Sequence, residues 1–138
     1  MITALLSINW LAVLAAAALN FVLGGVWFMV LFKRQYAEAM EIEAAPEEKP
    51  GFTIIVGPFI CSLVVIATTA FLFRLISVTE MSTALTLGAV LGIGLLGAQT
   101  VTIAINPNFP KPFYYSAINV PYFLIGSLIT SAVLVLMT

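Results

Sequence analysis

Four uncharged polar residues lie inside long apolar stretches of this chain. They are Asn20, Gln99, Asn119 and Tyr122. Carboxamides and a phenol donate and accept hydrogen bonds, but they carry no charge at neutral pH. Such groups can join neighbouring helices or orient a neutral solute, whereas proton relays in membranes use ionisable residues.

The stretches that hold these residues are long enough to cross a membrane. Residues 1–32, 50–73, 81–110 and 112–138 contain no Asp, Glu, Lys, Arg or His, so the uncharged runs are 32, 24, 30 and 27 residues long. A hydrocarbon layer of roughly 30 Å needs about 20 apolar residues in an α-helix. Because backbone groups in lipid must be satisfied within their own segment, we predict an all-α, integral membrane four-helix transmembrane bundle.

The composition predicts one membrane domain over residues 1–138. The hydrophobic fraction is 62% and the charged fraction is 8%, whereas soluble domains are about one quarter charged. We expect spans at about 8–32, 52–74, 82–105 and 113–137, with a soluble loop at 33–51. The first run lacks a basic N-terminal region and is too long for a signal peptide, so we interpret it as a retained span.

The same composition excludes several classes of function. A net charge of −1 argues against nucleic acid, which requires a basic face. One cysteine, Cys61, and no histidine exclude an internal disulfide and a Cys/His metal site. No nucleophile has an adjacent base. We therefore expect no enzyme activity and no catalytic, cofactor-binding or metal site.

Each predicted span carries one stripe of small and polar residues on a single helical face. From the first span to the fourth, the stripes are: first, Asn9, Ala16, Asn20, Gly24 and Trp27; second, Gly57, Cys61 and Thr68; third, Gly88, Gly92, Gln99, Thr102 and Asn106; fourth, Tyr115, Asn119, Tyr122, Gly126 and Thr130. We expect the stripes to face the bundle interior. There Asn20, Gln99, Asn119 and Tyr122 form a polar cluster, and Gly24, Gly88, Gly92 and Gly126 allow close helix packing.

Two interpretations of the stripes remain open. Hydrogen-bonded helix packing is the favoured one, and a small polar cavity is the alternative, with Pro58 and Pro121 freeing backbone carbonyls to line it. The small multidrug transporters are similar in outline, but they depend on a membrane-embedded Glu in the first span, and the matching depth here holds Asn20. The motif Gly92-Ile93-Gly94-Leu95-Leu96-Gly97 imitates a dinucleotide fingerprint, yet that fingerprint acts only between a strand and a helix.

The basic residues predict the orientation. Lys33, Arg34, Lys49 and Lys111 lie on one side of the four spans, and Arg74 lies on the other. The positive-inside rule puts loop 33–51 in the cytoplasm and both termini outside, in a cell membrane that we expect to be the bacterial inner membrane. The acidic cluster from Glu38 to Glu48 fits a solvated face better than a cation site, because its spacing differs from that of a calcium loop.

Short motifs along the chain resemble domain-of-unknown-function family 1761. They are Asn9-Trp10-Leu11, Gly24-Gly25-Val26-Trp27-Phe28, Leu31-Phe32-Lys33, and Ile118-Asn119-Val120-Pro121-Tyr122-Phe123-Leu124-Ile125-Gly126. The resemblance implies a small four-span membrane protein of unassigned activity. Family members often have Gly where this chain has Pro121 and His where it has Phe123, so a proton-linked activity through that His would be missing here.

These observations predict a non-catalytic structural or interaction subunit. The alternative is a carrier or channel for a small neutral or hydrophobic solute, using a polar cavity between the helices. The lipid bilayer is the expected environment. Glycine stripes on a thin bundle also make a homo-oligomer or a membrane-protein partner plausible.

Overall fold

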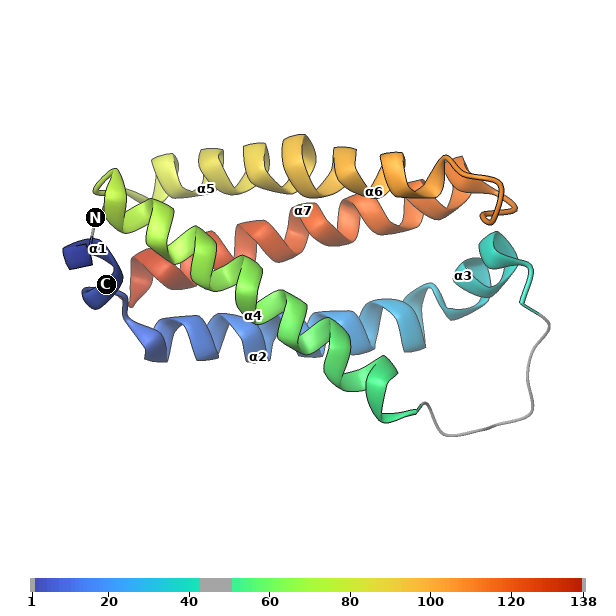
Figure 1. Cartoon of the computed structure of the whole chain (residues 1–138), viewed down its shortest axis with the longest axis horizontal. Coiled ribbons are helices and arrows are strands. Elements are labelled where there is room, and N and C mark those ends of the chain that lie inside the picture. Colours follow the sequence, from blue (N-terminus) through green and yellow to red (C-terminus); the bar gives the residue numbers. More distant parts are fainter. Residues whose placement is uncertain (1, 43–50, 138) are drawn as a thin grey trace.

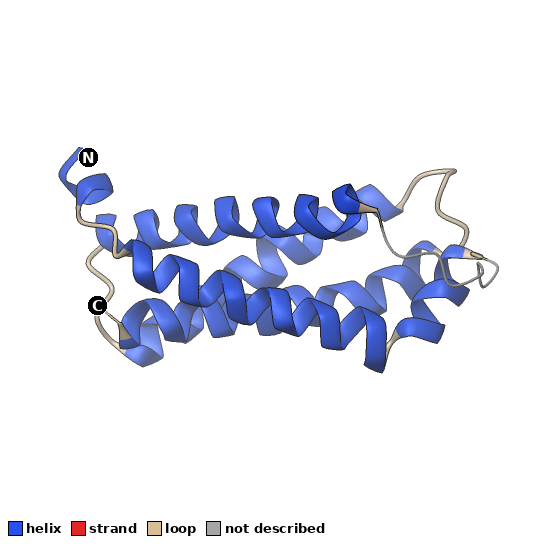
Figure 2. Cartoon of the chain, turned by 90° about the horizontal axis from the view of Figure 1, so that it is seen from below, coloured by secondary structure: helices blue, strands red, loops and turns tan. Residues whose placement is uncertain are grey.

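The computed structural model describes residues 2–42 and 51–137, and the regular structure in these residues is helical. The chain passes through α1 (Ile2–Leu6), α2 (Trp10–Val26), the π-helical segment η1 (Trp27–Leu31), α3 (Lys33–Met40), α4 (Phe52–Leu75), α5 (Met81–Ala89), the π-helical segment η2 (Val90–Gly97), α6 (Ala98–Ala104) and α7 (Pro112–Leu136). Figures 1 and 2 show these helices as one elongated bundle.

Four helices of the described chain are long and apolar enough to cross a membrane, which confirms the predicted fold class. They are Trp10–Leu31, which joins α2 to η1, then α4, then Met81–Ala104, which joins α5, η2 and α6, and finally α7. α1 and the C-terminal end of α7 lie at one end of the bundle, and α3 lies at the other (Figure 1). With four spans the chain returns to the end at which it started, so both termini lie there, and α3, which follows the first span, lies at the opposite end.

Local sequence explains where the helices begin and end. Asn9 caps α2, because its Oδ1 accepts hydrogen bonds from the backbone N–H groups of Leu11 and Ala12 at 3.1 and 3.2 Å. Pro112 occupies the first turn of α7, where the missing N–H costs nothing. Ser77 ends α4 in the left-handed region with φ of 56°, and the Val78 N–H then bonds back to the Phe73 carbonyl.

α7 is the central element of the bundle. It packs against the α5–η2–α6 span on one side and against α2 on another, and it also contacts α3. α4 crosses the bundle obliquely (Figure 1), and its main packing partner is α2. Its buried residues, Ile66, Thr69, Ala70 and Phe73, all belong to its second half.

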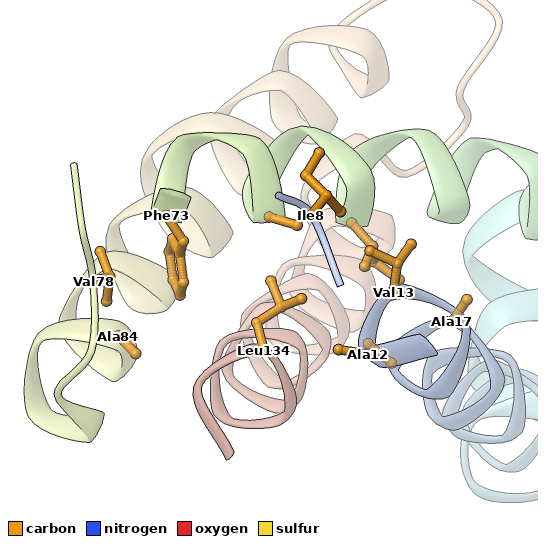
Figure 3. Packing of buried hydrophobic residues seen from close by; sticks show 11 residues of the cluster. Ile8, Ala12, Val13, Ala17, Phe73, Val78, Ala84 and Leu134 are labelled. Carbon is orange, nitrogen blue, oxygen red and sulfur yellow. The ribbon is translucent and has the colours of Figure 1, made fainter. Parts of the chain in front are cut away.

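A cluster of apolar side chains joins the helices at the end that holds the termini. Phe73 of α4, Leu134 of α7 and Val13 of α2 point toward one another in Figure 3, together with Ile8 and Ala12. Lipid is as apolar as these side chains, so close van der Waals packing stabilises the cluster, with little contribution from exclusion of water.

Candidate functional site

Three side chains of the first span reach across to α7. Asn9 Nδ2 donates to the Met137 carbonyl at 2.6 Å, Asn20 Nδ2 donates to Thr130 Oγ1 at 3.0 Å, and the indole N–H of Trp27 donates to the Ile118 carbonyl at 3.1 Å. Asn9 and Asn20 are 11 residues apart, and Asn20 and Trp27 are 7 apart. These separations are about three and two helical turns, so the three donors lie on one face. We call these six residues the α2–α7 seam. It joins two antiparallel helices over most of their length.

Asn20 is the buried centre of the seam. Its side chain is 7% exposed, and its Nδ2 also donates to the Ala16 carbonyl at 2.9 Å. A methyl group added at Gly126 would lie 2.5 Å from Asn20 Oδ1. The absence of a side chain at Gly126 therefore creates the space that the Asn20 carboxamide occupies.

Tyr122 extends the seam toward the end that carries α3. Its ring lies 4.9 Å from the ring of Phe28 and 6.2 Å from that of Trp27, measured between centroids. A methyl group at Gly24 would lie 3.2 Å from the Tyr122 hydroxyl oxygen, so Gly24 lets the half-buried phenol approach the first span. Aromatic rings and an indole are typical of the membrane boundary.

Asn119 is buried, but it does not join Asn20. Its side chain is 4% exposed, and its Nδ2 donates to the Tyr115 carbonyl, one turn earlier in α7, at 2.8 Å. The bond to its own helix satisfies this amide without a partner from another span. The predicted cluster of four residues is thus divided: Asn20 and Tyr122 contact the seam, while Asn119 bonds within α7.

The prediction that Gln99 faces the interior is wrong. Gln99 is exposed, as is Thr102 of the same predicted stripe, whereas Thr100 is buried and its Oγ1 donates to the Leu96 carbonyl at 2.7 Å. The buried residues of this span are Ala84, Gly88, Gly92, Gly97, Thr100 and Ala104. The step of five residues from Gly92 to Gly97 lies in η2, whose wider turns add one residue to the interior repeat.

The stripe predicted for the second span is also wrong at two positions. Cys61 and Thr68 are exposed, Gly57 is half-buried, and α4 buries Thr69 among larger apolar residues. Thr68 satisfies its hydroxyl by donating to the Val64 carbonyl of its own helix at 2.8 Å. Packing of Ile66, Ala70 and Phe73 sets the inward face of α4, and these apolar residues were not part of the predicted stripe.

Close contact between α7 and the third span depends on glycines. A methyl group at Gly88 would lie 2.5 Å from Ser131 Oγ, and one at Gly92 would lie 2.9 Å from Leu124 Cα. Both positions were predicted for helix packing. Gly97 and Ser131 were missed: Gly97 faces Val120, and Ser131 Oγ is buried without a hydrogen-bond partner among the described residues. The four-residue spacing of Ser127 and Ser131 was a usable signal for this face.

The enclosed space found near these polar groups is small. A cavity of ≈ 20 Å³ lies among Asn9, Arg74 and apolar residues at the end that holds the termini. This volume has room for about one water molecule. A wider hollow of ≈ 220 Å³ lies over the turn from Ile76 to Glu80 and is also lined by Thr83 in the first turn of α5. Asn20, Asn119 and Tyr122 line neither of them.

The acidic cluster lies partly outside the described residues. Glu38 and Glu41 belong to the described chain, but Glu43, Glu47 and Glu48 do not, and neither do Pro46, Lys49 and Pro50 near the predicted end of the soluble loop. Glu41 pairs with Lys111 across 3.9 Å. This contact between two exposed side chains contributes about 0 to 1 kcal/mol.

Comparison with known proteins identifies one family. The model of the family described as protein of unknown function (DUF1761) matches residues 11–135. The match includes Asn20, Trp27, Ile118 and Thr130 of the seam. No curated protein and no solved structure matches this chain.

Proposed function

The chain belongs to the DUF1761 family of proteins of unknown function, and from that premise we propose that it is a non-catalytic structural or interaction subunit of a membrane. We place it in the bacterial inner membrane, with residues 33–51 in the cytoplasm and both termini outside. The charge asymmetry supports the orientation: Lys33, Arg34, Lys49 and Lys111 against Arg74.

The observation that carries this proposal is the environment of Asn20. Its amide nitrogen has two acceptors, the Ala16 carbonyl and Thr130 Oγ1, and its oxygen fills the space at Gly126. A solute-binding amide instead presents unpaired donors or acceptors to a cavity. Asn20 therefore acts as a link between helices.

A double-mutant cycle tests this link. Asn20→Leu and Thr130→Val each remove one partner, and we expect a coupling of about 0.6 to 1.7 kcal/mol, from the average to the maximum measured for hydrogen bonds between membrane helices. Reversible unfolding in mixed detergent micelles measures it. Thr68→Val is the control, because this exposed hydroxyl bonds within α4 and should show no coupling to Asn20. Zero coupling between Asn20 and Thr130 would contradict the link.

Permeability assays separate the proposed role from transport. Proteoliposomes should shrink and swell in glycerol or urea at the rate of protein-free liposomes, because the amides of Asn20 and Asn119 and the indole of Trp27 are engaged with helix partners. A carrier would accelerate swelling, and Asn20→Leu would abolish that acceleration at unchanged thermal stability. That result would reject the structural role and establish a solute pathway.

A further inference from the structure

We propose that the small cavity beside Arg74 binds one monoatomic anion, such as chloride, where α2, α4 and α7 meet. The cavity of ≈ 20 Å³ has two polar side chains in its lining, those of Arg74 and Asn9. Its other lining residues are apolar: Ala12, Ala70, Phe73, Val78 and Leu134. These five belong to the apolar cluster at the end that holds the termini (Figure 3).

Arg74 carries a positive charge that has no carboxylate partner in the described chain. It is half-buried, and its guanidinium makes no ion pair or hydrogen bond with a described residue. Glu80, the nearest acidic residue in the sequence, is exposed and lines the separate hollow over the turn. The carbonyl end of α4 offsets part of the charge, but α2 begins beside the same cavity and presents its positive end there. A half-buried guanidinium in such surroundings requires an acceptor or a counter-ion.

Asn9 contributes a second donor to the cavity. Its Oδ1 already accepts from the N–H groups of Leu11 and Ala12, and its Nδ2 donates to the Met137 carbonyl. A carboxamide nitrogen carries two hydrogens, so one N–H of Asn9 is still available. Both polar side chains of the lining therefore offer donors, and neither offers a free acceptor. This lining fits an anion better than a water molecule, which must also donate its own hydrogens.

The volume and position of the cavity decide which anion can bind. The cavity has room for about one water molecule, so chloride or bromide fits, whereas phosphate and sulfate are too large. Arg74 lies one residue before the end of α4, and Asn9 directly precedes α2, so ions can reach the cavity from the water at this end of the spans. α4 has few contacts with α7. A bound anion would connect the end of α4 to both α2 and α7.

Thermal unfolding in detergent tests the site, with chloride exchanged for gluconate at constant ionic strength. Once the site is saturated, each tenfold rise in chloride should raise the unfolding midpoint by about 3 to 6 °C, and bromide but not sulfate should replace chloride. Arg74→Gln removes the charge and should abolish this dependence. Lys33→Gln, at an exposed basic residue of the opposite end, is the matched control for general salt effects and should keep it. Equal midpoints in chloride and gluconate, or the same chloride dependence in Arg74→Gln, would overturn the proposal.

Bromide locates the ion in the wild-type protein, so the test does not depend on the folding of Arg74→Gln. Crystals grown in sodium bromide should give an anomalous peak in contact with the Arg74 guanidinium and the Asn9 amide. An ordered water without anomalous signal in this place would refute the anion site. Neither result alters the permeability assay or the coupling between Asn20 and Thr130, so failure of the anion site is distinguishable from failure of the subunit role.

Discussion

At the scale of single residues, Asn20 and Gly126 are 106 positions apart in the chain, and the fit between them joins α2 to α7. Asn20 Nδ2 donates to Thr130 Oγ1, and the missing side chain of Gly126 leaves the space that Asn20 Oδ1 occupies. The two residues depend on each other, because a methyl group at Gly126 would displace the carboxamide, and a buried amide that loses its acceptors costs about 1 to 3 kcal/mol. The packing of α2 on α7 at this point therefore depends on the identity of both residues.

We expect Gly126→Ala to destabilise the protein by about 1 to 3 kcal/mol, as overpacking does in other well-packed interiors. The added methyl group would lie 2.5 Å from Asn20 Oδ1 and would displace the carboxamide from Thr130. Thermal unfolding in detergent measures the change.

Gly25→Ala is the control for Gly126→Ala, because a methyl group there meets nothing within 4 Å. Its stability should be unchanged or higher by up to about 1 kcal/mol, the difference in helix propensity. Equal losses in the two variants would show that Gly126 contributes only backbone flexibility.

At the scale of the elements, η2 decides which side of the third span faces α7. The interior residues Gly88 and Gly92 follow ordinary α-helical spacing, and Gly97, Thr100 and Ala104 resume it after a step of five. η2 therefore behaves as the insertion of one residue into a regular helix. Both halves of the span keep their contact with α7 because the extra residue is accommodated in the π-helical turns.

Deletion of Gly94 should be tolerated. Gly94 is exposed, and its removal would restore an α-helical step of four between the interior positions now held by Gly92 and Gly97. We expect a cooperative thermal transition and, in a Cys61→Ser background, protection of Thr100→Cys from a thiol reagent while Gln99→Cys reacts.

Deletion of Thr86, an exposed residue in the regular helix α5, is the comparison for the Gly94 deletion. It would rotate the start of the span by about 100° relative to the rest, because each α-helical residue turns by that angle. Loss of the folded state is expected there. Equal damage from both deletions would mean that η2 is not a one-residue insertion.

At the scale of the whole molecule, α7 is the helix on which the other spans assemble. The α2–α7 seam lies on one of its faces and the glycine contacts of the third span lie on another, whereas α4 adds mainly to α2. The turn from Ile76 to Glu80 lies at the same end of the bundle as α1, and the connection from Ile105 to Lys111 lies near α3 (Figure 1). Labels placed in these connections therefore report which end of the bundle faces the cytoplasm.

In a Cys61→Ser background, a membrane-impermeant thiol reagent on intact cells should label Cys introduced at Ser7 or Thr79. It should spare Cys introduced at Glu41 or Asn108 until the cells are opened. All four positions are exposed and lie outside the four spans. The physical reason is the excess of Lys and Arg on the side of Lys33 and Lys111. Labelling of Glu41→Cys alone in intact cells would reverse the orientation and leave the bundle unchanged.

The sequence by itself determined the four apolar helices and the family, because both depend on residue type along a continuous stretch. An uncharged run longer than 20 residues has few stable forms in lipid, so its local composition is sufficient. The same local reasoning placed Asn20, Gly88, Gly92 and Gly126 on helix contacts, since three- and four-residue spacing holds throughout α2 and α7 and up to the start of η2.

Tertiary structure decided which residues face inward beyond the point where that spacing changes. Gln99 and Thr102 were assigned to the interior on the assumption of an uninterrupted α-helix, and η2 turned them outward while bringing in Thr100. The partner of Asn20 was likewise undetermined, since Asn119 and Thr130 lie on the same helix and only the relative placement of α2 and α7 selects Thr130. Contacts between distant segments depend on the sum of all packing interactions, and no local pattern in one helix specifies that sum.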